Sequence, residues 1–378
     1  MFPIDSGTLP ELPAPFWFVE FFKVLGFCLH ILAMNLWFAG LPMAIIAFLL
    51  STSNSRRFAV RMFSQLPVIM ALGINFGIVP LLFIQVAYYK PFYTSTIFMA
   101  WHWFLVIPLL AVAYYGLYLC AYSLKPGGKS GYLLPFGLIS MFCLLAIAYI
   151  QVNAMSLMGR PDIWNVLWNK NSIGAATLGT GINSSDPTLW LRYGSMFGLA
   201  LVTSAVWMIF DANWLIRKTN DENQKKLDNS YRLWTKRFAS FFAILGGLVL
   251  VFSFCQYLQI LKTLPMTQDW LPSTPGQVFS LGTLILPLLT AVLILFSGKS
   301  CQSALLLFLI QFIGIAFFAI FRQFVQNLEV SQVMQIAQHP VKVQWDTLIP
   351  FLVIFVIGVL IIVWMLRQLA TAPPVEEK

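Results

Sequence analysis

Charged residues are scarce in this sequence. Asp, Glu, Lys and Arg together make up 10% of its 378 residues, whereas soluble domains contain about 25%. Hydrophobic residues make up 59%, which is more than a single membrane span could account for. The composition therefore excludes a soluble nucleic-acid-binding protein, although the net charge is +9, and it predicts a polytopic membrane protein.

Cysteine motifs are also missing. The five cysteines form no CxxC pair and no CxxCH haem-attachment motif. All five lie in or beside apolar stretches, where a free cysteine behaves as a small hydrophobic residue. Covalently attached haem is therefore not expected.

Carboxylates are absent from the middle of every expected membrane span. Glu20 falls at the edge of the first span, three residues before Lys23, a spacing that favours an ion pair along a helix. Asp211 falls near the end of the fifth. A proton-conducting oxidase or pump would normally need acidic groups within the membrane. Their absence argues against proton conduction.

Apolar stretches long enough to cross a bilayer, which takes ~20 residues per helix, recur about nine times. The expected spans are 16–50, 64–89, 95–123, 131–157, 189–215, 238–262, 276–297, 302–325 and 347–367. The predicted fold is an all-α polytopic membrane helix bundle, a single integral membrane domain over 1–378. The short N-terminal segment 1–15 and the C-terminal tail 370–378 are expected to lie outside the bundle.

Basic residues concentrate in alternate connections between the expected spans. One set of connections holds Arg56, Arg57, Arg61, Lys125, Lys129, Arg217, Lys218, Lys225, Lys226, Arg232, Lys236, Arg237, Lys299, Arg367 and Lys378. The opposite set holds fewer, namely Lys90, Arg160, Lys170, Lys262 and Lys342, with Arg192 and Arg322 near helix ends. By the positive-inside rule, the N-terminus lies outside and the C-terminus inside.

The chain has three histidines, and two of them fall inside apolar spans. With the hydrocarbon beginning near Phe21, His30 lies ~14 Å deep, and His102 lies ~9 Å beyond Thr96, at 1.5 Å per residue. Both enter from the outer side, so two histidines on different helices could ligate one haem iron from opposite faces. The alternative for each is a neutral imidazole that bonds to a neighbouring helix. The third, His339, falls in a connecting loop.

Amide side chains inside the spans form a second set of polar residues. Most are expected to make interhelical hydrogen bonds, worth about 0.6 kcal/mol each in membranes. Gln85, Gln151 and Asn153 lie toward the outer side, where a quinone headgroup or a haem edge could use them. Outer cations could pair with haem propionates or an acidic partner, or they could snorkel at the interface; they are Lys23, Lys90, Arg160, Arg192, Lys262 and Arg322.

Several short motifs occur in an order that resembles subunit I of cytochrome bd quinol oxidase. His30 matches the haem-ligand histidine of that family's first helix, and Ile74-Asn75-Phe76 matches a motif of its second. The segment from Val152 to Pro161 is similar to the end of its fourth helix, and Arg322-Gln323 to the Arg-Gln pair of its eighth. The resemblance covers most of the chain in layout. It implies nine spans, an outside N-terminus and haem near the outer face.

The chain departs from this family at other ligand positions. Ala319-Ile320-Phe321 stands where the family has a haem-ligating glutamate, and Arg192-Tyr193-Gly194 where its fifth helix begins with a ligand histidine. The stretch from Gly276 to Ser297 has no methionine ligand, and Leu264 to Pro275 makes only a short turn in place of the long quinol-binding loop. The family's three-haem centre, and its reduction of oxygen, are therefore not expected.

The resemblance implies a membrane subunit of a respiratory electron-transfer complex. Such a subunit would bind one b-type haem near the outer face and exchange electrons between quinone or quinol and a partner cytochrome. Its haem would be held by His30, with His102 as the second ligand or with an open position; Met34, one turn away, is a weaker candidate. The candidate cofactor-binding residues are His30, His102, Asn75, Asn153, Arg160, Arg322 and Gln323.

The same resemblance implies a multi-pass protein of a bacterial or archaeal cytoplasmic membrane. Its expected partners are other membrane subunits of a redox complex, quinone, and a c-type cytochrome on the outer side. A haem-free structural or quinone-binding subunit of a cytochrome bd-like complex is the alternative. A transporter would call for discontinuous spans or a mid-membrane charge, and the sequence shows neither.

Overall fold

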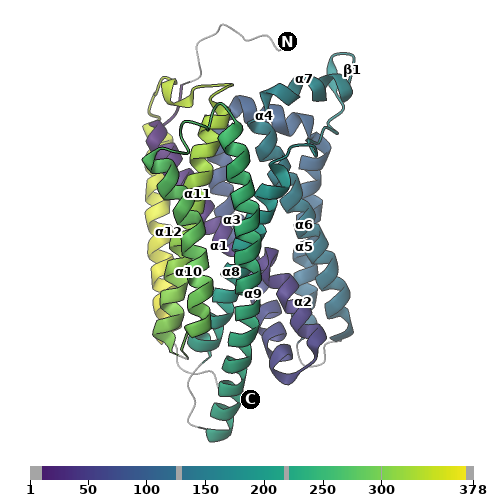
Figure 1. Cartoon of the computed structure of the whole chain (residues 1–378), viewed down its shortest axis with the longest axis vertical. Coiled ribbons are helices and arrows are strands. Elements are labelled where there is room, and N and C mark those ends of the chain that lie inside the picture. The colour runs from purple at the N-terminus through teal and green to yellow at the C-terminus, as the bar shows by residue number, and fades with distance from the viewer. Residues whose placement is uncertain (1–10, 125–129, 217–220, 299, 372–378) are drawn as a thin grey trace. The chain divides into compact units, whose positions relative to one another are not determined.

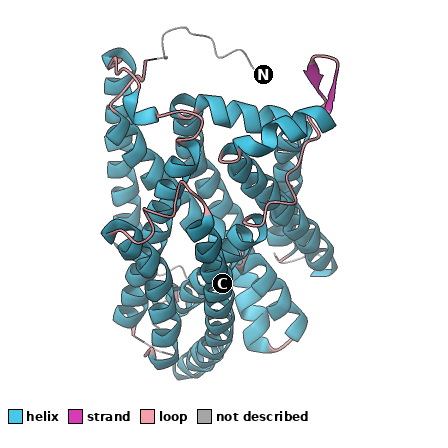
Figure 2. Cartoon of the chain, turned by 45° about the horizontal axis from the view of Figure 1, so that its top comes forward, coloured by secondary structure: helices cyan, strands magenta, loops and turns pink. Residues whose placement is uncertain are grey.

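The computed structural model describes residues 11–124, 130–216, 221–298 and 300–371. Helices make up most of the described residues, and the named strands form one pair of two residues each (Figure 2). The helices are α1 (Phe16–Phe38), α2 (Gly40–Leu50), α3 (Ser53–Ala87), α4 (Tyr89–Phe98), α5 (Ala100–Ser123), α6 (Leu133–Met158), α7 (Pro161–Lys170), α8 (Leu189–Phe210), α9 (Glu222–Thr263), α10 (Thr274–Phe296), α11 (Cys301–Val330) and α12 (Trp345–Thr371). The strands are β1 (Ser172–Ile173) and β2 (Ala176–Thr177).

Eight membrane spans can be assigned among the described residues, each long and apolar enough to cross a bilayer. They correspond to the first eight expected spans, so the prediction of an all-α polytopic membrane bundle is confirmed. The ninth expected span, 347–367, is helical within α12, although the apolar stretch counted there, Trp345–Gly358, is too short to qualify. The topology of the two termini stays a prediction, and residues 1–10 and 372–378 lie outside the described chain.

Several helix ends differ from those expected. The first span is broken at Ala39 into α1 and α2. The third begins at Ala100, because Thr96 belongs to the separate helix α4. The fifth span ends in a π-helical turn, Asp211–Leu215, and α11 continues five residues beyond the expected end at 325. Hydropathy marks apolar stretches, whereas a helix continues into polar residues as long as its backbone bonds are satisfied.

Side-chain caps explain where four helices begin. Thr52 and Ser55 form a reciprocal capping box before α3. Asp221 accepts a hydrogen bond from the backbone of Asn223 at the start of α9. Ser273 and Ser300 cap α10 and α11 in the same way. Each cap satisfies one of the backbone N–H groups that the first turn of a helix leaves free.

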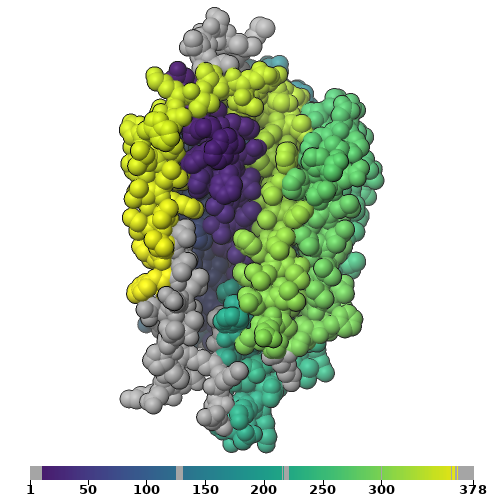
Figure 3. Space-filling view, turned by 90° about the vertical axis from the view of Figure 1, so that its left-hand side faces the viewer, coloured from purple at the N-terminus to yellow at the C-terminus, as the bar shows by residue number. Residues whose placement is uncertain are grey.

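The chain divides into two compact units, residues 1–21 with 335–378 and residues 22–334. In the smaller unit, the backbone around Leu12 pairs with that around Val341, and Phe18 packs against Phe351 of α12. In the larger unit, α8 and α9 run side by side, with α5 and α6 on one side and α10 and α11 on the other (Figure 1). The paired helices α10 and α11 also reach its surface together (Figure 3).

Helices α8 and α9 approach closely because glycines face each other. A Cβ at Gly198 would lie 2.5 Å from the backbone nitrogen of Leu250 and 2.8 Å from the carbonyl oxygen of Gly246. Small residues at such contacts let membrane helices pack backbone against backbone. The main core of the larger unit surrounds this contact and includes the fully buried Leu41, Phe63 and Tyr231.

Candidate functional site

His30 of α1 is held by the backbone of α3. Its Nδ1 atom lies 2.7 Å from the carbonyl oxygen of Gly73. A carbonyl can only accept, so Nδ1 carries the proton and Nε2 keeps its lone pair. A Cβ at Gly77 would lie 2.7 Å from the same Nδ1, so α3 makes room for the ring by lacking side chains there. Histidines that ligate metals commonly have this arrangement, with one ring nitrogen bonded to a carbonyl.

Arg322 of α11 brings a positive charge to the same region. Its guanidinium lies over the ring of Phe27, 4.2 Å from the centroid, and acts electrostatically on His30. The side chain is half-buried, and it makes no hydrogen bond or ion pair with any described residue. A cation in this position is suited to an anionic group.

Arg192 of α8 and Glu329 of α11 form an ion pair beside Arg322. The two side chains are in direct contact, and their exposed fractions are 17% and 4%. The guanidinium of Arg192 also lies 5.0 Å from the ring centroid of Tyr257 and donates to the Thr188 hydroxyl at 3.1 Å. A buried pair of this kind is neutral as a whole. Arg322 interacts electrostatically with both of its members but forms no ion pair of its own with a described residue.

A second acidic centre, Asp186, holds the loop before α8. It accepts hydrogen bonds from the Ser156 hydroxyl and from both the backbone nitrogen and the hydroxyl of Thr188. Arg160 lies 3.5 Å from the same carboxylate and makes a two-pronged bond to Asp162 at 3.0 and 2.7 Å. The hydrogen bond from Arg160 lowers the pKa of Asp162.

Asn153 and Gln323 are buried in the same part of the larger unit. The Asn153 side-chain oxygen accepts from the backbone nitrogen of Asn183 at 3.2 Å, while its amide nitrogen has no partner among the described residues. Gln323 donates to the Tyr88 hydroxyl at 2.7 Å and to Asn327 at 2.8 Å. Both side chains therefore cross-link elements of the bundle.

One turn further along α11, Gln326 accepts from the ammonium group of Lys23 at 2.7 Å. That ammonium group also lies 3.7 Å from the centroid of the Tyr88 ring. We call the residues of this region the polar cluster: Lys23, His30, Asn153, Arg160, Asp186, Arg192, Arg322, Gln323, Gln326 and Glu329. It contains five of the seven residues predicted to bind a cofactor.

His102 is not joined to this cluster by any contact between described residues. It lies two residues after the start of α5, ~3 Å along that helix, whereas His30 lies fourteen residues, ~21 Å, after the start of α1. The predicted depths, ~14 Å for His30 and ~9 Å for His102, were similar; the observed positions differ more because the third span starts later than expected. Its Nδ1 atom is buried without a hydrogen-bond partner among the described residues. Ligation of one iron by both histidines stays a prediction.

Asn75 also lies apart from the cluster. Its side chain is exposed and donates to the carbonyl oxygen of Ala71, one turn earlier in α3, at 2.8 Å. The residue that the family motif selected therefore lies on the exposed surface of the larger unit. No described residue from another helix bonds to it.

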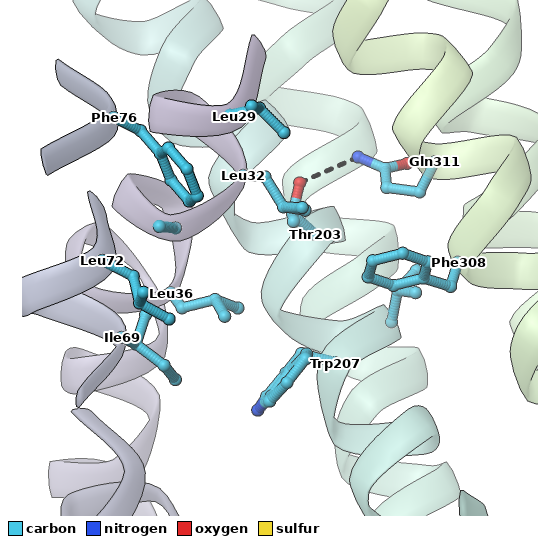
Figure 4. Close-up of a pocket in the computed structure, with 12 residues that line it drawn as sticks. Leu29, Leu32, Leu36, Ile69, Leu72, Phe76, Thr203, Trp207, Phe308 and Gln311 are labelled. Carbon is cyan, nitrogen blue, oxygen red and sulfur yellow. Dashed lines mark hydrogen bonds between the residues drawn. The ribbon is translucent and has the colours of Figure 1, made fainter. Parts of the chain in front are cut away.

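An apolar cavity of about 170 Å³ lies beside α1, the helix that carries His30 (Figure 4). Its lining comes from α1, α3, α8 and α11: Leu29, Leu32, Ala33, Leu36, Ile69, Leu72, Phe76, Thr203, Val206, Trp207, Phe308 and Gln311. The Thr203 hydroxyl accepts from the amides of Gln311 and Asn35, both at 2.9 Å. The oxygens of these two amides are buried without partners among the described residues.

Sequence reasoning missed the two carboxylates of the cluster, Asp186 and Glu329. Glu329 was placed beyond the membrane because hydropathy ended the eighth span at 325. Its helical spacing from Arg322 and Gln326, seven and three residues, puts the three on one face and could have revealed it. Asp186 lies in a connection with no periodicity, so no sequence signal marked it.

Comparison of the chain with models of known protein families and with curated proteins gave no match.

Proposed function

We propose that this chain is a membrane subunit of an electron-transfer complex, holding one b-type haem through Nε2 of His30. The supporting observation is the hydrogen bond from Nδ1 of His30 to the carbonyl oxygen of Gly73. It fixes the tautomer and the ring plane, so the free lone pair has a defined direction. Such preparation is what a haem-ligating histidine requires.

The positive charge near His30 is suited to the carboxylate of a haem propionate and would repel an additional metal ion. Arg322 supplies a cation that forms no ion pair with a described residue and is close enough to act on His30. Trp37 adds aromatic surface beside the imidazole of His30, and Phe27 adds it beneath the guanidinium of Arg322. Arg322 would hold a propionate, while His30 would hold the iron. When bound, a b-type haem supplies reversible one-electron transfer.

The second axial position of the haem iron distinguishes three forms of this proposal. Either His102 or a ligand from outside the chain occupies it, or the position stays open. The placement of His102 at the start of α5, without a contact to His30 among the described residues, supports the forms that do not use it. Electrons would pass between quinone and a partner cytochrome, with other membrane subunits completing the complex in a bacterial or archaeal cytoplasmic membrane.

A haem-free, quinone-binding subunit is the alternative, and the cavity in Figure 4 favours it. Its walls are apolar, and Leu29 and Leu32 contribute to them from the helix that carries His30. At about 170 Å³ it is smaller than pockets for drug-sized ligands, roughly 300–1,000 Å³. It is suited to one or two isoprenoid units of a quinone tail rather than to a whole quinone or haem.

Haem content of the full-length chain, purified from membranes in mild detergent, tests the proposal. We expect a pyridine-haemochrome spectrum of b type at one haem per chain, lost in His30→Ala. His102→Ala removes the other histidine of an apolar span and separates the forms of the proposal: the haem is retained with an unchanged spectrum unless His102 is the second ligand. Absence of haem from the purified wild-type chain, together with saturable binding of a short-chain quinone, would establish the alternative.

A further inference from the structure

A second cavity, of about 260 Å³, opens near the π-helical turn that follows α8. It is lined by the end of α8, the first half of α9 and the residues after α10: Ile209, Ala212, Asn213, Arg232, Leu233, Lys236, Ser297 and Gly298. Nothing in the proposed electron transfer uses this cavity. Its chemistry differs from that of the cavity beside His30, because two cations line it.

Both cations are fixed in place by backbone carbonyls. Nε of Arg232 donates to the carbonyl oxygen of Ala212 at 3.1 Å, and Nζ of Lys236 donates to that of Ser297 at 2.7 Å. An Arg has five N–H donors and a Lys three, so most of their donors remain for a ligand. The pair is therefore held in position before anything binds.

No described carboxylate pairs with either cation. The ion pairs of this region join Arg57 to Asp228 and Arg61 to Asp211 instead. Residues 217–220 and 299 lie outside the described chain; in the sequence they read Arg-Lys-Thr-Asn and Lys and include no acidic residue. Like charges four residues apart on a helix repel each other and destabilise it. An anion between Arg232 and Lys236 would attract both side chains and offset their mutual repulsion.

The cavity lies at the level where α9 becomes apolar. Lys236 precedes the expected apolar span 238–262 by two residues, and Leu233 and Ile209 give the cavity apolar walls. Beyond it, Phe241 and Phe296 are 61% and 79% exposed, in the surface that α9 and α10 present. Basic pockets between helices at this level bind lipid headgroups. A ligand here would have an anionic head and an apolar body.

We propose that Arg232 and Lys236 bind the phosphate of an anionic phospholipid, seated with its acyl chains along α9 and α10. The site is independent of the haem proposal, since it shares no residue with the polar cluster. It gives the bundle a specific lipid at one membrane interface.

Native mass spectrometry of the full-length chain can count lipids that remain bound. The probes are phosphatidylglycerol and phosphatidylcholine with identical acyl chains, and inorganic phosphate. We expect one phosphatidylglycerol retained at least tenfold more tightly than phosphatidylcholine, and a loss of about tenfold or more in R232Q/K236Q. The control K226Q/R237Q removes the same charge from exposed positions of α9 and should bind as wild type does.

Two results would overturn the assignment. One is a failure of either comparison: the chain retains the two lipids equally, or wild type and R232Q/K236Q retain phosphatidylglycerol equally. The other is inorganic phosphate that displaces phosphatidylglycerol at millimolar concentration, because the site would then recognise free phosphate. The melting temperatures of R232Q/K236Q and of the control variant should agree within a few degrees. A loss of lipid binding in R232Q/K236Q then does not reflect unfolding.

Discussion

Nδ1 of His30 and the carbonyl oxygen of Gly73 lie 2.7 Å apart, across the contact between α1 and α3. This bond links the one histidine of the polar cluster to a stretch of α3 that presents glycine at both Gly73 and Gly77. The geometry requires that α3 have no side chain where the imidazole lies. A substitution in α3 can therefore test the proposed role of His30 without changing the histidine itself.

Gly77→Ala is expected to displace the His30 ring. The new methyl group would lie 2.7 Å from Nδ1, closer than any relaxed contact, and the ring would have to move. Overpacking of this kind costs about 1–3 kcal/mol. We expect a lower melting temperature and, under the haem proposal, a haem content well below one per chain.

Gly131→Ala is the matched control, because a Cβ there meets no atom of the described residues within 4 Å. It should melt and bind haem as wild type does. A Gly77→Ala chain with unchanged stability would show that the α1–α3 contact is looser than described. Normal haem content in a destabilised Gly77→Ala chain would argue against His30 as the ligand.

The ion pair between Arg192 and Glu329 predicts a large coupling. Removing one partner of a buried pair leaves the other charge unpaired, at a cost of about 3–5 kcal/mol. We expect Glu329→Gln and Arg192→Gln each to be strongly destabilising in reversible unfolding by sodium dodecyl sulfate. The double variant should lose much less than the sum of the two.

The exposed pair of Lys225 and Glu222 on α9 provides the comparison, with exposed fractions of 45% and 76%. Glu222→Gln should change the unfolding free energy by no more than about 0.5 kcal/mol. Additive effects of Arg192→Gln and Glu329→Gln would mean that the two charges are compensated by different neighbours.

Hydropathy predicted the class of fold and the approximate place of each span because burial in lipid demands long apolar helices. It could not predict the break at Ala39 or the separate helix α4. Both features depend on which neighbouring groups accept or donate hydrogen bonds at the helix ends, and those neighbours are set by tertiary contacts. The same limit explains why the third span was expected to begin before His102 by several residues.

Within the site, sequence reasoning selected residues by type and by family motif. Arg160, Arg322 and Gln323 were found in this way, and they lie in the polar cluster. Asn75 was selected by the same kind of match, but it lies on the exposed face of α3, because a motif does not fix the rotation of a helix. Glu329 was missed because hydropathy ended the expected eighth span at 325, four residues before it.

The contact between α8 and α9 predicts that Gly198→Ala is among the costlier small substitutions. Its Cβ would lie 2.5 Å from the backbone nitrogen of Leu250, which cannot turn aside as a side chain would. The helices must separate, at a cost of at least about 1–3 kcal/mol. Gly247→Ala is the control on α9, because its nearest neighbour is the flexible end of Leu288 at 3.1 Å. Equal melting temperatures of the two variants would contradict the close approach.

The bond between Arg160 and Asp162 predicts a pH dependence at the start of α7. The hydrogen bond from Arg160 lowers the pKa of Asp162 from its ordinary value of 3.8. The ionised form is therefore favoured by folding, so the contribution to stability is fully present above the ordinary value. It is lost as the pH falls through the lowered pKa. Above pH 5, neither the bond nor the start of α7 should change with pH.

Titration of the Asp162 carboxyl carbon by NMR, in the selectively labelled full-length chain, measures this directly. We expect a midpoint below 3.8 in wild type and a higher one in Arg160→Gln, which removes the donor. Lys170→Gln removes a charge from the other end of α7 and should leave the midpoint unchanged. Because Asp162 is 58% exposed, solvent screens the pair, and the melting temperature at neutral pH should fall only slightly in Arg160→Gln if Asp162 is its main partner. A large fall would instead assign the stabilising role of Arg160 to its contact with the buried Asp186.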